Sequence, residues 1–228
     1  MWTSEISSTV FFAANRWTVS YFTDTGDAAA SSFKMRPLCE VAFERKGAVD
    51  PQLLGEASIV YLGLENIRPL TGELVSFSAR PASSIKSRSK VFQEGDVLYG
   101  RLRPELNKVF LPNGNAMEGL CSGEFIVLTP RTDVVLPRYL RHILASTFVT
   151  RYASKFTVGA SLPRMATSDL LSIEIPVPPI SVQNKLVEAL EDFDAEIKSL
   201  RERLERLPEA VAEGLLIAIS AGNSSIEV

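Results

Sequence analysis

The chain has 228 residues, 46% hydrophobic and 22% charged, which is an ordinary globular composition with enough chain for a sizeable core. Its apolar runs are far shorter than the roughly 18 residues of a membrane-spanning helix, and no basic segment precedes an apolar N-terminal stretch. We therefore expect a cytoplasmic protein without a signal peptide or membrane partner. The net charge of −3 by itself argues weakly against nucleic acid as a ligand.

The charge is unevenly distributed along the chain. Residues 80–170 carry 13 basic and 7 acidic side chains, a balance of +6, whereas residues 1–79 sum to −3 and residues 171–228 to −6. A positive middle region between two acidic ends can hold an electrostatic footprint for DNA that the total charge hides. The alternative is an uneven scatter of solvated surface charges.

The first 176 residues predict a domain of many short strands. The Ala/Ser run at residues 28–32 suggests a loop or the first turn of a short helix, and residues 39–46 suggest a helix end or turn. The distribution of β-branched, aromatic and alternating apolar residues predicts strands over residues 58–64, 74–79, 97–99, 109–111, 124–128 and 172–176. Polar stretches predict the turns and loops between them, at residues 65–73, 80–90 and 112–119.

One amphipathic helix is expected among these strands. Residues 137–152 carry apolar side chains at helical spacing, namely Leu140, Ile143, Leu144, Phe148 and Tyr152. Many short strands with an embedded helix predict an α+β fold, in which a curled, mainly β domain occupies residues 1–176.

A long helix is predicted after the Pro-rich residues 176–179, with Ser181 as its cap. Its apolar positions recur in alternating steps of four and three residues, the pattern of a coiled-coil seam that binds a second helix. The seam residues are Leu186, Leu190, Phe193, Ile197, Leu200, Leu204, Leu207 and Val211. The alternative is an amphipathic helix that packs on its own domain, although the apolar stripe of such a helix is usually broader.

Pro208 lies near the end of this pattern. Because proline lacks an N–H group and clashes with the carbonyl of Leu204, it predicts a kink or the start of a second short helix that ends near Ile219. We therefore divide the chain into a domain over residues 1–176, a coiled-coil helix over residues 177–219 and a disordered tail over residues 220–228.

The sequence lacks catalytic and metal-binding patterns. We expect the widely spaced Cys39 and Cys121 to be core or half-buried residues without a disulfide or zinc, and the single histidine, His142, to be a surface or half-buried helix residue. No P-loop, nucleophile elbow or dinucleotide-binding pattern occurs. The spacing of Glu44 and Lys46 is found in nucleases but is common by chance. We therefore predict a non-catalytic binding protein with no metal and no cofactor of its own.

Three segments together resemble one protein family. The first is residues 61–67 (YLGLENI) with the following Thr71 and Gly72; the second is residues 95–104 (GDVLYGRLRP), continuing to 106–108 (LNK). The third is residues 159–165 (GASLPRM), leading to residues 175–179 (IPVPP) and Gln183, and residues 121–128 (CSGEFIVL) fit the same pattern. In order and spacing they are similar to a target recognition domain of type I restriction–modification specificity subunits, followed by that family's spacer helix.

The resemblance implies a subunit that reads DNA sequence in phage defence. Full-length members of the family carry two such domains and two long helices, and this chain has one of each, so it resembles the half-length form, which pairs with a second copy or with another half. The implied partners are double-stranded DNA, a second copy in a homodimer, DNA methyltransferase subunits and, as a further candidate, a restriction motor subunit. S-adenosylmethionine would bind the methyltransferase subunit. The alternative is a coiled-coil adaptor protein that does not bind DNA.

Basic residues of the middle region are the candidates for DNA contact, namely Lys86, Arg88, Lys90, Arg101, Arg103, Lys108, Lys155 and Arg164. The first three lie in a serine-rich segment that suits either phosphate contacts or a plain solvated loop. The arginines have the side chain that reads guanine edges. Arg101 and Arg103 could instead pair with the acidic residues Glu94, Glu105 or Glu124.

Overall fold

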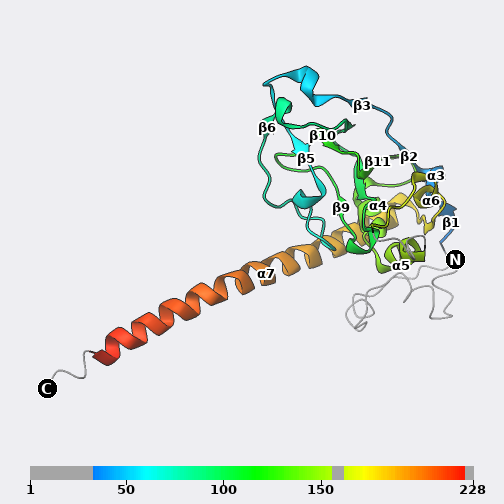
Figure 1. Cartoon of the computed structure of the whole chain (residues 1–228). Helices are drawn as coiled ribbons and strands as arrows, with labels where there is room; N and C mark the ends of the chain where they lie inside the picture. The colour runs from blue at the N-terminus through cyan, green and yellow to red at the C-terminus, as the bar shows by residue number, and fades with distance from the viewer. Residues whose placement is uncertain (1–32, 156–161, 224–228) are drawn as a thin grey trace, which may run out of the picture. The chain divides into compact units, whose positions relative to one another are not determined.

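The computed structural model describes residues 33–155 and 162–223 (Figure 1). Contacts divide the chain into two compact units, Met1–Lys185 and Leu186–Val228, so the division between them falls inside the long helix. The predicted loop at residues 28–32 lies outside the described residues.

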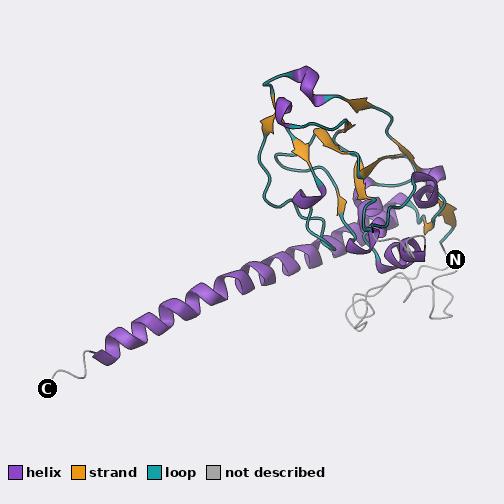
Figure 2. Ribbon diagram, in the orientation of Figure 1, coloured by secondary structure: helices purple, strands orange, loops and turns teal. Residues whose placement is uncertain are grey.

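Figure 2 shows the strands of the chain in orange. One four-stranded antiparallel sheet has the order β2-β11-β8-β9. Its strands are β2 (Ala42–Glu44), β11 (Phe125–Pro130), β8 (Val97–Gly100) and β9 (Val109–Phe110). In the central pair, Phe125 lies opposite Gly100 and Leu128 opposite Val97. The residues of this pair are almost all buried, which accounts for their nearly continuous apolar sequences.

A second four-stranded sheet has the order β3-β7-β10-β5. Its strands are β3 (Ala48–Val49), β7 (Ser89–Phe92), β10 (Gly119–Ser122) and β5 (Tyr61–Leu62). All neighbours are antiparallel except β10 and β5, which are parallel. Two short antiparallel pairs complete the domain: β1 (Met35–Pro37) with β12 (Glu174–Pro176), and β4 (Ser58–Ile59) with β6 (Arg80–Pro81).

Short helices connect the strands, and one long helix follows them. The 3-10 helices are η2 (Pro51–Leu54), η3 (Leu64–Asn66), η4 (Ala82–Ser84) and η5 (Pro104–Leu106). The α-helices are α3 (Leu38–Val41), α4 (Pro137–Leu144), α5 (Thr147–Lys155), α6 (Thr167–Leu171) and α7 (Ile180–Asn223). Several sheets, embedded helices and a long C-terminal helix confirm the predicted α+β fold class.

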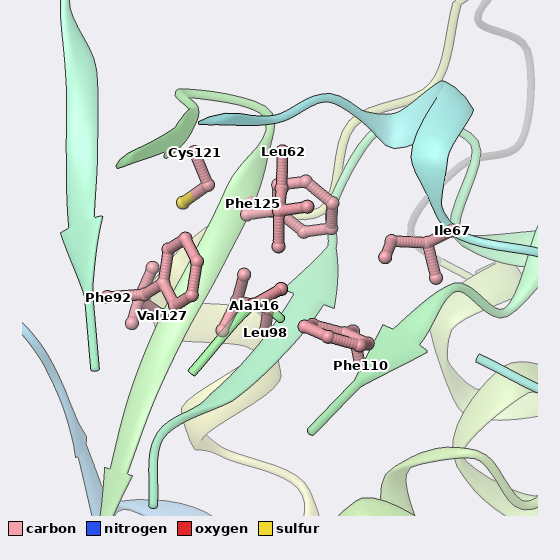
Figure 3. Close-up of a cluster of buried hydrophobic side chains, with 9 residues drawn as sticks. All are labelled: Leu62, Ile67, Phe92, Leu98, Phe110, Ala116, Cys121, Phe125 and Val127. Atoms are coloured by element: carbon pink, nitrogen blue, oxygen red, sulfur yellow. The ribbon is translucent and has the colours of Figure 1, made fainter. Parts of the chain in front are cut away.

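The main core joins the two four-stranded sheets (Figure 3). The second sheet contributes Leu62, Phe92 and Cys121; the first contributes Leu98, Phe110, Phe125 and Val127; Ile67 and Ala116 come from connecting segments. Because successive residues of a strand point to opposite faces, the neighbours Tyr61, Val91 and Leu120 form a smaller apolar cluster with Ile59 and Ile85. The second sheet therefore carries apolar side chains on both faces.

The predicted strands at residues 97–99, 109–111, 124–128 and 172–176 are confirmed with shifted ends, and others are corrected. Residues 58–64 form β4, β5 and the start of η3. Residues 74–79 form no strand, because Leu74 makes only an isolated bridge and Ser76 has a left-handed φ of 49°. The predicted loop at 80–90 contains β6 and the start of β7, and β10 was not expected because Gly and Ser have low β propensity.

The single helix predicted over residues 137–152 is in fact two helices. The break falls at Ala145 and Ser146, between α4 and α5. Asn107 Nδ2 donates to the Ala145 carbonyl oxygen at 2.6 Å and to Thr150 Oγ1 at 2.7 Å, so a distant side chain satisfies the end of one helix and contacts the next. The apolar spacing continues across the break, which is why the sequence alone does not reveal it.

Helix α7 also differs from its prediction at both ends. It begins at Ile180, so Ser181 lies inside the first turn and is not the cap. It runs unbroken past Pro208 to Asn223, which excludes a second helix starting at the proline and moves the end beyond Ile219; the rest of the predicted tail lies outside the described residues. None of the helices in the described part of the chain has the length and apolarity to cross a membrane.

Candidate nucleic-acid interface

Two segments of the domain, residues 48–59 and 80–90, run antiparallel and form what we call the paired arm, at the upper edge of Figure 1 between β3 and β6. One end is closed by β3 against β7, with Val49 opposite Ser89, and the other by β4 against β6, with Ser58 opposite Pro81. Between them, backbone hydrogen bonds join Ser83 N to Gly55 O at 2.8 Å and Ala82 N to Ala57 O at 2.9 Å. Backbone pairing therefore holds the arm at its β3–β7 end and from its β4–β6 end as far as Ser83.

Lys86 and Arg88 are exposed on the paired arm. Arg88 Nη2 lies 3.5 Å from the Ala48 carbonyl oxygen, a long hydrogen bond that leaves most of the guanidinium accessible. Ser84 and Ser87 beside them are exposed as well. This combination of cations and hydroxyls suits contact with phosphate oxygens.

Lys90, predicted to act with these two residues, is placed differently because it belongs to strand β7. Its Nζ donates to Glu44 Oε1 at 2.9 Å and to the Phe125 carbonyl oxygen at 2.8 Å. Burial acts to raise the pKa of Glu44, but the hydrogen bond and charge of Lys90, with Lys46 and Thr167, outweigh it and lower that pKa. Lys90 thus compensates a half-buried carboxylate inside the domain, which favours a structural role.

Three predicted arginines come together where β8 ends. Residues 101–103 run antiparallel to residues 163–165 and form what we call the arginine edge. The backbone joins Arg103 N to Pro163 O at 2.9 Å and Met165 N to Arg101 O at 3.0 Å, with Leu102 and Arg164 in an isolated bridge. These contacts place the backbones of Arg101, Arg103 and Arg164 side by side, from segments about 60 residues apart in the chain.

Two arginines of the edge pair with carboxylates, of which Glu105 is exposed and Glu124 is partly exposed. Arg103 Nε lies 3.0 Å from Glu105 Oε1, and Arg164 Nε lies 3.0 Å from Glu124 Oε1. The arginine side chains are 53% and 48% exposed, respectively, and ion pairs at such exposure contribute little to stability. Arg101 differs, because its Nε is buried and makes no hydrogen bond within the described residues.

Two further candidates do not join these groups. Lys108 turns inward and donates from Nζ to the Leu64 carbonyl oxygen at 2.6 Å. Burial lowers the pKa of Lys108, and the charge of Glu65 partly opposes that change. Lys155 ends α5, and its side chain lies outside the described residues.

The described residues with potential reactivity include Cys39, Cys121 and His142. Within the described ranges, no three His, Cys, Asp or Glu residues gather in a group that could hold a metal ion. Burial raises the pKa of Cys121 to about 12, so its thiol is not a nucleophile. Cys39 is exposed, which corrects the prediction that it is a core or half-buried residue. His142 is half-buried on α4 as expected, with Nδ1 3.0 Å from Arg141 Nη1.

Comparison with known proteins identifies what the chain is similar to. Among curated relatives, the type I restriction enzyme EcoDI specificity subunit of Escherichia coli is 23% identical over 198 residues, which span 85% of this chain and 42% of that protein. The HindI specificity subunit of Haemophilus influenzae is 24% identical over 128 residues, 55% of this chain and 28% of its own length. The chain thus spans less than half the length of these curated relatives.

Solved structures show the same fold. The HsdS subunit from Thermoanaerobacter tengcongensis superposes with a TM-score of 0.65 at 27% identity, covering 78% of this chain and 47% of that one. A chain solved in work on complex assembly of the type I R-M system gives 0.65 at 26% identity, covering 82% and 49%. Residues 78–209, which include both the arginine edge and most of the predicted seam, match the type I restriction modification DNA specificity domain, and the chain belongs to that family.

Proposed function

We propose that the chain is a DNA sequence-reading subunit that performs no chemistry itself and that binds one half of a bipartite target. The observation that carries the proposal is the arginine edge, where Arg103 and Arg164 are exposed and held by the backbone of two distant segments. An arginine can bind the O6 and N7 atoms of guanine through two hydrogen bonds, which is the commonest specific contact in the major groove. Membership of the specificity family supports the same function.

The paired arm has a complementary role in this proposal. Lys86 and Arg88 contact phosphates and thereby fix the position of the domain on the duplex, whereas the arginine edge distinguishes bases. Lys90 and Lys108 are left out of the interface because their ammonium groups are hydrogen-bonded within the domain. The proposed interface is therefore smaller than the predicted set of eight basic residues.

Helix α7 supplies the partner-binding surface. Its seam residues Ile197, Leu200, Leu204, Leu207 and Val211 are between 43% and 67% exposed. Apolar side chains at this spacing are covered in a stable assembly by a second helix, and we propose a second copy of the chain. DNA methyltransferase subunits, which would carry S-adenosylmethionine, and a restriction motor subunit would dock on the resulting dimer.

Fluorescence polarisation with a random-sequence DNA duplex tests the proposal. A DNA-reading subunit binds the duplex at low salt and loses affinity steeply as salt rises, because phosphate contacts release counterions. The exposed seam by itself also suits a coiled-coil adaptor, and that function predicts no duplex binding at any salt concentration. Absence of binding, with and without the methyltransferase subunit, would therefore favour the adaptor.

A further inference from the structure

Leu53 is the most exposed large apolar side chain in the described part of the chain, at 84%. It lies in η2, on the paired arm, and its neighbour Leu54 is 45% exposed. Single exposed leucines are common on protein surfaces and by themselves indicate nothing. The backbone that holds Leu53 and the charges around it distinguish this residue.

Hydrogen bonds and a proline fix the backbone of the turn that carries Leu53. The Asp50 carboxylate accepts a hydrogen bond from Gln52 N at 3.1 Å, and the buried Pro51 fixes the first residue of the turn. Gly55 ends it with a φ of 59°, a conformation that favours glycine, and accepts the hydrogen bond from Ser83. An apolar side chain on a fixed backbone loses little conformational entropy when it meets a partner.

The charges of the paired arm favour DNA as that partner. The arm contains four basic residues, Arg80, Lys86, Arg88 and Lys90, and two acidic residues, Asp50 and Glu56. Arg80 stacks over Tyr61 at 4.3 Å and Lys90 pairs with Glu44, which leaves Lys86 and Arg88 as the exposed cations. Asp50 is engaged at the start of η2, and Glu56 is a further exposed acid of the arm. The paired arm therefore combines an exposed leucine on a fixed backbone with two exposed cations and the exposed hydroxyls of Ser84 and Ser87, which is the composition of a surface that enters a DNA groove.

We infer that Leu53 is a specificity-determining residue that contacts the C5 methyl group of a thymine in the major groove. This inference rests on the proposed DNA-reading function. The leucine side chain has no donor or acceptor, so it cannot read the hydrogen-bonding edge of a base. The thymine methyl is the one apolar group that a base presents in the major groove, and it distinguishes thymine from every other base.

The test starts from duplexes that the wild-type chain, with its methyltransferase subunit, selects from a random pool. Each thymine of the selected sequence is then replaced by deoxyuridine, which removes only the methyl group. Wild-type protein should lose about fourfold in affinity at one or two positions, the change equivalent to about 0.8 kcal/mol for one buried apolar carbon. Leu53→Ala should bind the thymine and deoxyuridine duplexes equally at those positions.

Two control variants separate this role from general effects. Leu70→Ala removes a leucine that is 68% exposed on another turn and should keep the wild-type preference for thymine. A double variant, Lys86→Ala with Arg88→Ala, should bind every duplex more weakly and keep the same preference. If Leu53→Ala retains the wild-type ratio at every thymine, or if Leu70→Ala loses it equally, the inference is wrong while the proposed function stands. If wild-type protein selects no sequence, the proposed function fails and removes the inference with it.

Discussion

Arg45 and Asp96 form a two-point ion pair, with Arg45 Nε 2.6 Å from Asp96 Oδ2 and Arg45 Nη2 2.9 Å from Oδ1. The Asp96 side chain is 1% exposed, and it also accepts hydrogen bonds from Thr129 Oγ1 and Gln93 N. The carboxylate thereby links the end of β2 to the start of β8 and to β11. The hydrogen bond to Asp96 raises the pKa of Arg45 despite the opposing effect of burial.

Replacing Asp96 by Asn should destabilise the domain by about 3–5 kcal/mol, because a partly buried guanidinium loses its compensating charge. Urea denaturation followed by circular dichroism measures the change in free energy of unfolding. Glu40→Gln is the matched control, since its pair with Arg36 is largely exposed and its loss should cost at most about 1 kcal/mol. Equal losses for the two variants would contradict this account of Asp96.

Lys90 and Glu44 predict a pH-dependent contribution to stability. The pKa of Glu44 is lowered from its ordinary value of 4.5, so the contribution is complete above pH 4.5 and is lost as the pH falls through the lower, folded-state value. Lys90→Met should therefore be less stable than wild type at pH 7 by about 1–3 kcal/mol, and the difference should shrink on acidification. Unfolding curves across this range measure it; a difference that does not change with pH would show that Glu44 is not responsible.

The segments that carry the family resemblance hold the arginine edge and also several buried polar residues of the scaffold. Asn66, Asp96, Asn107 and Gln183 all lie in or directly after those segments, and all four are buried. Gln183, for example, accepts from Leu136 N at 2.8 Å and donates to Val134 O at 2.9 Å and Pro178 O at 2.8 Å. Buried polar groups need defined partners, so these residues specify the fold and make it recognisable in the sequence.

The sequence predicts the residues of the paired arm on the proposed DNA-contacting surface less completely. Lys86, Arg88 and Leu53 are exposed on the paired arm, of which the sequence analysis predicts only residues 80–90 as a loop and residues 58–59 as part of a strand. Tertiary pairing of two segments about 30 residues apart makes the arm, and no local pattern encodes such pairing. Composition identified the cations, but the roles of Lys90 and Lys108 depend on Glu44 and the Leu64 carbonyl, which are distant in sequence. Leu53 was missed because an apolar pair in a turn resembles core.

The double variant Lys86→Ala with Arg88→Ala should weaken binding to all DNA sequences by the same factor. If each cation contacts one phosphate, the slope of log affinity against log salt should fall by about 2 in magnitude. Fluorescence polarisation with two unrelated duplexes over a salt series measures both quantities. A loss confined to one sequence would show instead that these residues read bases.

Lysine in place of Ile197 and Leu204 should convert the proposed dimer into a monomer. Both side chains are exposed in the predicted seam, at 43% and 66%, and burying two cations there would carry a large desolvation cost. Light scattering at micromolar concentration measures the mass, and Ser199→Lys adds a charge to the same stretch of α7 outside the seam and should leave the dimer intact. A monomeric wild-type protein in the absence of partners would contradict the prediction.

The geometry of such a dimer predicts the form of the DNA target. Two-fold symmetry presents the same surface to opposite strands, so a dimer with antiparallel helices requires an inverted repeat. The helical stretch over residues 181–207 lies within α7 and spans roughly 40 Å at about 1.5 Å per residue. Half-sites one helical turn of DNA apart are separated by about 34–36 Å. We therefore expect two short half-sites separated by a non-specific gap, with centres roughly one turn apart.

Mapping of methylated positions, in cells that express only this subunit and its methyltransferase, measures the target directly. The symmetric dimer should yield a gapped palindrome, and the Ile197→Lys, Leu204→Lys variant should abolish methylation at it, because a single half-site offers half of the contacts. Co-expression with a different half-subunit should produce an asymmetric bipartite site that retains one of the original half-sites, since each domain reads its own half. A continuous or non-palindromic motif, obtained when this subunit is expressed without a different half-subunit, would exclude the symmetric arrangement. The two recognition surfaces would then have to differ.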